Sequence, residues 1–291
     1  MIATTGFFDG VHTGHRLVIE RLVSLSRERG DESLVVTFWP HPRAVLQDGA
    51  RELRLLTTLE EKKALLAGLG VDRIEVLDFT RRFAALTARE YLTLLRDRFG
   101  VTTLLMGYDN RIGSDRLTAP DLAPAATVLG MELIFVGESL EEHSPSRQPV
   151  SSTKIRKSLE QGDIESATAM LGYGYSLTGV VVAGNRLGRT IGFPTANMKL
   201  YEPLKLVPAR GVYAVEVQVL GQTWRGMTNI GTRPTVGGSV TTIETNILDF
   251  DEDIYGLPLR LTFLRRLRDE IHFPSLDDLC AQLEIDREAC R

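Results

Sequence analysis

The sequence contains only two cysteines, Cys280 and Cys290, and both lie near its C-terminus. Without a second pair they cannot form a disulfide framework, and no cysteine and histidine grid of zinc-ligand spacing accompanies them. The sequence also lacks an apolar run of about 18 residues and a basic, apolar leader after Met1, the patterns of membrane insertion and export. We therefore expect a protein of the reducing cytoplasm that contacts no membrane.

Positive charge is not in excess either: 34 lysines and arginines stand against 38 acidic residues, for a net charge of −4. This balance argues against a nucleic-acid-binding surface, although it is compatible with a local basic pocket for phosphates. A length of 291 residues with 43% apolar content is ordinary for about two globular domains. No internal repeat is visible, and a monomer is the expectation.

The first half of the chain alternates short apolar runs with amphipathic segments. Strands are predicted at residues 2–6, 34–38, 73–77, 101–106 and 132–136. Helices are predicted between them, at residues 15–29, 59–69, 88–99 and 120–129. This alternation predicts an α/β domain with a mostly parallel sheet, helices on both faces and ligands at the carboxyl ends of the strands.

The second half has a different character, with β-branched or alternating runs between glycines and prolines. These runs occupy residues 176–183, 212–220, 222–230, 243–250 and 259–263, and one helix is expected from residue 275 to about 283. Five or more such strands in about a hundred residues favour a small closed antiparallel β-barrel. We place the boundary near Tyr173, which gives domains 1–172 and 173–291, with a connecting helix at 164–171.

A candidate anion site follows the first predicted strand, in the stretch Gly6-Phe7-Phe8-Asp9-Gly10-Val11-His12-Thr13-Gly14-His15. His12 and His15 are three residues apart at the mouth of a helix, where free amides and the helix dipole favour negative charge. Gly6, Phe7 and Gly14 are the candidate phosphate contacts beside them. Two alternatives stay open: capping or surface histidines, and a zinc pair, which lacks a third ligand nearby.

A second candidate lies where the first half ends, in Val150-Ser151-Ser152-Thr153-Lys154-Ile155-Arg156. Ser152 or Thr153 is a good N-cap, and Arg156 then lies on the first helical turn. Amides, hydroxyls and a guanidinium on one turn can hold a triphosphate. The alternative is a plain helix cap followed by a surface arginine.

A third candidate is the glycine-rich stretch from Gly184 to Asn197, which includes Gly188 and Arg189. Glycines at this spacing let backbone amides approach a polyanion such as a phosphate group, so Gly184, Gly188 and Arg189 are candidate phosphate contacts. Thr195 and Asn197 then place a hydroxyl and a carboxamide two residues apart, and hard oxygen ligands of this kind suit Mg²⁺. The alternative is an ordinary glycine-rich loop.

These stretches carry a resemblance to known families. Gly-Phe-Pro-Thr-Ala-Asn at 192–197 resembles the signature of riboflavin kinases, and His-Thr-Gly-His after Phe-Asp-Gly resembles the flavin adenylyltransferase branch of the nucleotidylyltransferases. Further similar segments occupy residues 37–42, 107–113, 150–156, 226–235, 243–250 and 267–273. Their order is that of the bacterial bifunctional riboflavin kinase and FAD synthetase family. Members usually carry a short N-terminal extension before the first strand.

The resemblance implies an α/β nucleotidylyltransferase domain, Rossmann-like with a parallel sheet, followed by a small β-barrel riboflavin kinase domain with a C-terminal helix. It implies that the barrel phosphorylates riboflavin with ATP and Mg²⁺ to FMN. The first domain then adenylylates FMN to FAD and releases pyrophosphate. His15 would contact the transition state, His12 the triphosphate, and these two with Arg156 would neutralise its charge.

In the kinase half, the resemblance assigns Glu244 as the base that takes the proton of the riboflavin hydroxyl, with Thr195 and Asn197 toward the metal. An outward-facing strand glutamate is the alternative. Arg268 and Asp109 are the implied flavin contacts. The alternative for Arg268 is a solvated member of the Arg265-Arg266-Leu267-Arg268 run.

One segment departs from the family pattern, because Asn110 and Ile112 stand where aromatic residues are usual. Two other readings therefore stay open. In the first, the chain is a riboflavin kinase only, with an inactive or flavin-sensing first domain. In the second, the chain is a non-catalytic flavin- or nucleotide-binding regulator.

Overall fold

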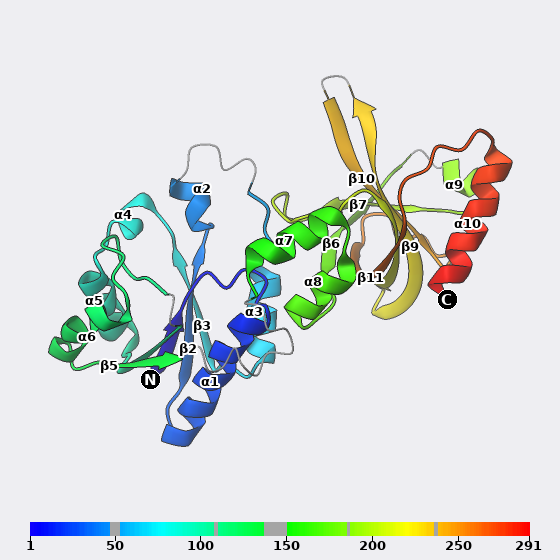
Figure 1. Cartoon of the computed structure of the whole chain (residues 1–291). Coiled ribbons are helices and arrows are strands. Elements are labelled where there is room, and N and C mark those ends of the chain that lie inside the picture. Colours follow the sequence, from blue (N-terminus) through cyan, green and yellow to red (C-terminus); the bar gives the residue numbers. More distant parts are fainter. Residues whose placement is uncertain (47–52, 108–109, 137–149, 185–186, 236–237) are drawn as a thin grey trace. The chain divides into compact units, whose positions relative to one another are not determined.

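The computed structural model describes residues 1–46, 53–107, 110–136, 150–184, 187–235 and 238–291. The chain forms two compact units, Met1–Ser152 and Thr153–Arg291 (Figure 1). The two units divide after Ser152, the first residue of the first of two helices that end the predicted first domain, and the boundary between residues 172 and 173 stays a prediction.

The first unit is built on a five-stranded sheet in the order β3-β2-β1-β4-β5, in which every pair is parallel. Its strands are β1 (Ile2–Thr5), β2 (Ser33–Trp39), β3 (Arg73–Asp78), β4 (Thr103–Gly107) and β5 (Glu132–Val136). The chain runs outward from central β1 first to one side and later to the other. The carboxyl end of β1 is therefore the switch point where such sheets bind ligands.

Helices cover both faces of this sheet. One face carries α1 (Thr13–Arg29) and α3 (Leu59–Gly68), and the other carries α5 (Ala88–Phe99) and α6 (Ala119–Val128), as Figure 1 shows. Short helices α2 (Pro42–Leu46) and α4 (Arg81–Ala84) complete the unit. Capping boxes start α3 at Thr58 and α5 at Thr87, which satisfies amides that the first turn leaves without partners.

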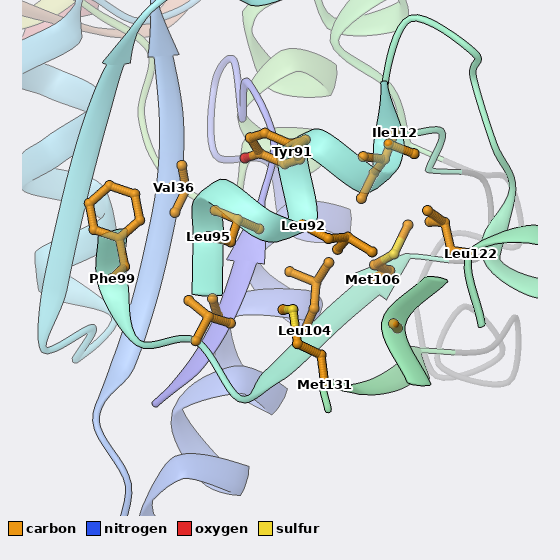
Figure 2. Packing of buried hydrophobic residues seen from close by; sticks show 14 of the residues in the cluster. Val36, Tyr91, Leu92, Leu95, Phe99, Leu104, Met106, Ile112, Leu122 and Met131 are labelled. Atoms are coloured by element: carbon orange, nitrogen blue, oxygen red, sulfur yellow. The ribbon is translucent and has the colours of Figure 1, made fainter. Parts of the chain in front are cut away.

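The larger hydrophobic cluster of the unit lies between the sheet and α5 and α6 (Figure 2). Leu92 and Leu95 of α5 pack there with Leu104 and Met106 of β4, and all four are 0% exposed. β4 is buried along its whole length, which explains its continuous apolar run.

The second unit is a closed antiparallel barrel in the order β10-β7-β6-β11-β8-β9. Its strands are β6 (Ser176–Val182), β7 (Ala196–Leu200), β8 (Gly211–Val219), β9 (Gln222–Thr235), β10 (Gly238–Ile247) and β11 (Pro258–Arg268). Its helices are α7 (Ser152–Gln161), which begins with the last residue of the first unit, α8 (Ile164–Leu171), α9 (Leu187–Thr190) and α10 (Leu276–Cys290). The predicted fold class is confirmed for both units.

The differences from prediction are local. Strand β7 and helix α9 were not predicted as separate elements, because each has at most five residues and lies in a glycine- and proline-rich stretch. Helix α10 continues to Cys290, past the predicted end, because its last turns pack on the barrel through Leu283 and Cys290. No helix in the described ranges is long and apolar enough to cross a membrane.

We expect Leu104→Ala to lower the free energy of unfolding of the first unit by about 2–5 kcal/mol, because it leaves a cavity in a closely packed cluster. Leu46→Ala is the matched control: Leu46 lies in the same unit and is 54% exposed, and a change of at most about 0.5 kcal/mol is expected. Urea unfolding followed by circular dichroism measures both. Equal effects of the two substitutions would contradict the described core.

Candidate active sites

The first site is the loop between β1 and α1, at the switch point of the sheet. Phe8 and Val11 have positive φ angles of 51° and 37°, a conformation that costs free energy in residues with side chains. The Phe8 ring lies over Gly6, where an added Cβ would come within 2.9 Å of the ring. Gly6 therefore serves close packing here, while its contact with ATP stays a prediction.

Asp9 fixes this loop in place. Its carboxylate is buried and accepts hydrogen bonds from the amides of Leu56 and Thr57, at 3.1 and 3.2 Å, just before α3. The Thr57 hydroxyl accepts a further bond from the amide of Gly10 at 3.1 Å. The Ser152 hydroxyl donates to the Asp9 carbonyl oxygen at 2.9 Å. The sequence did not predict this anchoring role of Asp9, because the amides that it binds are about 47 residues away along the chain.

The two histidines stack on each other, with ring centroids 3.6 Å apart. His12 is the N-cap of α1, and its Nδ1 accepts a hydrogen bond from the His15 amide at 3.3 Å. Gly14 lies beneath the His12 ring, where a Cβ would be 3.4 Å from it. His12 is thus a capping residue, and His15 Nδ1 is buried with no hydrogen-bond partner in the described ranges.

Burial lowers the pKa of both imidazoles. Desolvation brings the pKa of His12 to about 4, although the carboxylate of Asp9 acts in the opposite direction. Desolvation also lowers the pKa of His15 well below its usual value, and nearby His12 and Lys62 add to this effect. Both rings are therefore neutral at pH 7, and the neutralisation of phosphate charge by His12 and His15 stays a prediction.

The positive charge of this site belongs instead to Lys62, in the first turn of α3. Its side chain is 0% exposed, and Nζ donates to the Phe7 carbonyl oxygen at 2.7 Å. Sequence reasoning missed it, because Glu60-Glu61-Lys62-Lys63 has the pattern of a solvated helix start. The burial of Lys62 becomes visible only in the folded structure, where this face of α3 is packed against the loop.

A cavity of about 590 Å³ opens beside Gly6 and Phe7 and is walled by aromatic rings. Phe38 contacts Phe83 and Tyr91 there, with ring centroids 5.5 and 6.4 Å away. Ile112, which departs from the family pattern described above, is 5% exposed, belongs to the hydrophobic core and lines this cavity with Asn110. Asp109, a predicted flavin contact, lies outside the described residues.

The second candidate stretch is partly corrected. Helix α7 begins at Ser152, so Ser152 and Thr153 lie within its first turn and neither is the N-cap. The Ser152 hydroxyl bonds the Asp9 carbonyl oxygen instead of an amide of its own helix. Arg156 is the fifth residue of α7, beyond the first turn, and its phosphate contact stays a prediction.

In the second unit, two glycines of the third stretch are required by close contact. A Cβ on Gly184 would lie 2.1 Å from the Asn197 side-chain nitrogen, and one on Gly188 would lie 2.1 Å from the Phe193 carbonyl oxygen. The turn is closed by the Phe193 amide, which donates to the Gly188 carbonyl oxygen at 2.8 Å. The backbone at Gly184 is therefore in direct contact with the Asn197 side chain.

Glu244 lies on β10, directly between Asn197 of β7 and Asn229 of β9 in the strand register. Residues paired in this way project from the same face of a sheet. The Glu244 carboxylate is partly buried and forms an ion pair with Arg233 at 3.4 Å. The structure thus brings together the predicted base and one predicted metal ligand.

Two cavities meet at Thr195. The larger, about 600 Å³, is lined by Thr195, Glu244, Asn229, Asn246 and Arg268 together with apolar side chains. The other, about 310 Å³, is lined by Thr195, Arg189, Asp251, Glu252 and Asp253. The Asn246 side chain donates to the Pro194 carbonyl oxygen at 2.8 Å and so holds the segment that separates them. The site has room for one molecule on each side of Thr195.

Arg268 lines the larger cavity, but its guanidinium is already engaged. Nε and Nη2 donate to the Asp286 carboxylate at 3.0 and 2.7 Å, and the Gln282 amide donates to the same carboxylate at 2.9 Å. The Arg268 side chain is 16% exposed, so the alternative of a solvated arginine is wrong. A contact with flavin stays a prediction.

The described residues contain no group of three or more His, Cys, Asp or Glu side chains that could hold a metal ion. Mg²⁺ needs fewer protein ligands, because it keeps several waters and shares substrate phosphates. The Thr195 hydroxyl at the junction of the cavities and the Asn197 carboxamide near it are oxygen donors of the suitable hard type. The donor set therefore fits Mg²⁺.

Together these features define a class: a nucleotide-binding α/β domain joined to a closed-barrel transferase domain. Comparison with known proteins agrees with it. The FAD synthetase family matches residues 1–154, and the riboflavin kinase family matches residues 171–291. The chain belongs to the family of bifunctional riboflavin kinases and FMN adenylyltransferases.

Relatives with that bifunctional name match nearly the whole chain. The Escherichia coli protein is 39% identical over 100% of this chain and 91% of its own length. The Listeria monocytogenes protein is 36% identical with the same coverage, and the Bacillus subtilis protein is 34% identical over 99% of this chain and 90% of its own. A crystal structure named a macrolide-efflux protein from Streptococcus pneumoniae has a TM-score of 0.92 and 34% identity, over 100% of this chain and 93% of that one.

We expect the first unit to be less stable in acid because of His12. Its pKa is about 4 when folded and 6.5 ordinarily, so the unfolded chain binds a proton first as the pH falls. The stabilisation is complete above about pH 6.5, and about 2 kcal/mol is lost between pH 7 and pH 5.

Urea unfolding at pH 7 and at pH 5 tests this prediction. His12→Gln should reduce the loss, leaving the part due to His15, whereas His272→Gln, at an exposed position, should not; identical losses in all three proteins would contradict it.

We expect Asp286→Ala to destabilise the second unit by about 3 kcal/mol, because it leaves the Arg268 guanidinium without its partner. Glu288→Ala on the same helix removes a carboxylate that is 61% exposed, and should cost at most about 0.5 kcal/mol. Thermal and urea unfolding of both variants measure the difference. A similar small loss in both would show that the Arg268–Asp286 pair does not hold α10 on the barrel.

Proposed function

We propose that the barrel transfers the γ-phosphoryl group of ATP to the 5′-hydroxyl of riboflavin, with Glu244 as base. The junction at Thr195 carries this proposal, because it separates two cavities that can hold a donor and an acceptor. Glu244 lines only the larger of them, so riboflavin belongs there and ATP belongs in the smaller cavity with Arg189. The apolar walls of the larger cavity suit a flavin ring.

Within that arrangement, the Glu244 carboxylate accepts the hydroxyl proton as the oxygen attacks the γ-phosphorus and ADP leaves. Mg²⁺, held by Thr195 and Asn197 when bound, would neutralise charge on the phosphates. Gly184 and Gly188 leave the loop backbone close to the transferred group. Arg268 faces the flavin side of the cavity while Asp286 fixes its orientation.

The first unit then joins FMN to AMP. An oxygen of the FMN phosphate attacks the α-phosphorus of ATP, the bond to the β-phosphate breaks, and pyrophosphate leaves. The attacking oxygen is already anionic, so no strong base is needed. Neutral His12 and His15, amides at the start of α1 and Arg156 are the proposed contacts of the phosphates, and the aromatic cavity beside Phe7 receives the flavin ring.

The alternative of a kinase with an inactive first unit is not favoured. The FAD synthetase match covers that unit, and Ile112 fills the hydrophobic core where an aromatic residue is replaced. We further propose a cytoplasmic monomer that binds no nucleic acid, in keeping with the net charge of −4 and the free thiols of both cysteines.

Two substitutions separate the activities. Glu244→Gln should lower riboflavin phosphorylation by at least about a hundredfold and leave FMN adenylylation unchanged, because the base is lost from one site only. His15→Ala should do the reverse. Chromatography of flavins after incubation with ATP and Mg²⁺ measures both rates in each variant.

Glu216→Gln is the control for the first variant, because Glu216 is an exposed glutamate on another barrel strand, paired with Arg225. It should retain both activities. Loss of both activities in a folded Glu244→Gln or His15→Ala protein would overturn the assignment of two separate sites.

A further inference from the structure

Lys62 occupies an unusual position for a lysine. It is 0% exposed, whereas lysines are almost never fully buried unless they are paired. It also lies in the first turn of α3, at the positive end of the helix dipole, where a cation is unfavourable. Its neighbour Lys63 shows the ordinary case, with 43% exposure and an ion pair to Glu60.

No carboxylate in the described part of the chain lies within ion-pair distance of Lys62. Its bonds go to neutral oxygens, the Phe7 carbonyl at 2.7 Å and the Thr37 hydroxyl at 3.2 Å. Nζ also lies 3.6 Å from the centroid of the Phe7 ring. The charge of Asp9 acts on Lys62 and raises its pKa, but this carboxylate already accepts bonds from the amides of Leu56 and Thr57.

A buried cation without an ionic partner points to a missing anion. In the same loop, His15 Nδ1 is buried and has no hydrogen-bond partner among the described residues, and it lies at the start of α1, where the helix dipole favours negative charge. We propose that Lys62 is a positioning residue of the adenylyltransferase site: it holds the Phe7 carbonyl and supplies the positive charge that the bound polyphosphate balances. This inference rests on the proposed function of the first unit.

The titration of Lys62 agrees with this role. Burial lowers the pKa of Lys62 to about 8, while Asp9 acts to raise it, and the neighbouring groups are His12, His15, His41 and the α3 residue Glu61. The ammonium is charged below pH 8 and neutral above it. In the wild type, kcat/KM for FMN adenylylation should therefore fall as the pH rises through about 8.

The test compares Lys62→Met, Lys62→Arg and the control Lys63→Met in the full chain. Lys62→Met should lower kcat/KM for FMN adenylylation by at least about tenfold, because a charge near the departing pyrophosphate is lost. Its unfolding midpoint is measured alongside, because the Phe7 carbonyl oxygen loses a donor, and the rates are compared at a temperature where the variant is folded. Lys63→Met should change the rate by less than about twofold, and riboflavin phosphorylation should stay constant in all three proteins.

Lys62→Arg separates charge from shape. Arginine stays charged at pH 8, so Lys62→Arg should retain more activity than Lys62→Met. Its kcat/KM for FMN adenylylation should not fall as the pH rises through about 8. This variant also decides the question if Lys62→Met does not fold. The proposal is overturned if Lys62→Met adenylylates FMN as fast as Lys63→Met. It is also overturned if kcat/KM falls near pH 8 to the same extent in the wild type, Lys62→Met and Lys62→Arg.

A protein that forms no FAD at all would refute the proposed function of the first unit without deciding the role of Lys62. Calorimetric titration with inorganic pyrophosphate then decides it. Weaker binding by Lys62→Met than by Lys63→Met supports the buried counter-charge. Equal binding, or none in the wild type, overturns it.

Discussion

Both sites depend on backbone that approaches other groups more closely than a side chain permits. Gly6 lies under the Phe8 ring, Gly184 against Asn197, and Gly188 against the Phe193 carbonyl oxygen, each leaving less than 3 Å for a Cβ. These contacts leave amides and small polar side chains beside the places where phosphates are expected. The rest of each unit positions these segments: a parallel sheet with its switch point in one unit, and a closed barrel in the other.

The long-range anchors of the first loop explain why it can hold a strained conformation. Asp9 bonds two amides before α3, and Lys62 of α3 bonds the Phe7 carbonyl. The positive φ angle of Phe8 lies between these anchors, and that of Val11 lies two residues after Asp9. Strain of this kind persists only where surrounding contacts determine the backbone, so α3 belongs to the site although it carries none of the recognised motifs.

Much of this architecture follows from local sequence. Periodicity predicted every strand of the parallel sheet, and the glycines and prolines around residues 184–197 pointed to a loop that lines two cavities in the structure. What escaped prediction depends on contacts between distant segments. Lys62 is buried because α3 packs against the loop that contains Phe7. Arg268 of β11 is paired because α10, which carries Asp286, packs on the barrel. The neutral state of His12 likewise follows from its burial, which no spacing of histidines reveals.

The charges of the two sites match the two reactions. Riboflavin offers a neutral hydroxyl, so its phosphorylation requires a group that removes a proton, and a partly buried carboxylate, Glu244, lines the cavity proposed for riboflavin. FMN offers an oxygen that is already anionic, so a carboxylate there would repel it. In the first site the Asp9 carboxylate is buried and accepts bonds from two amides, and the other groups described are neutral histidines and a buried ammonium. Successive modifications of one molecule thus require opposite electrostatics, because the first reaction creates the charge that the second must accommodate.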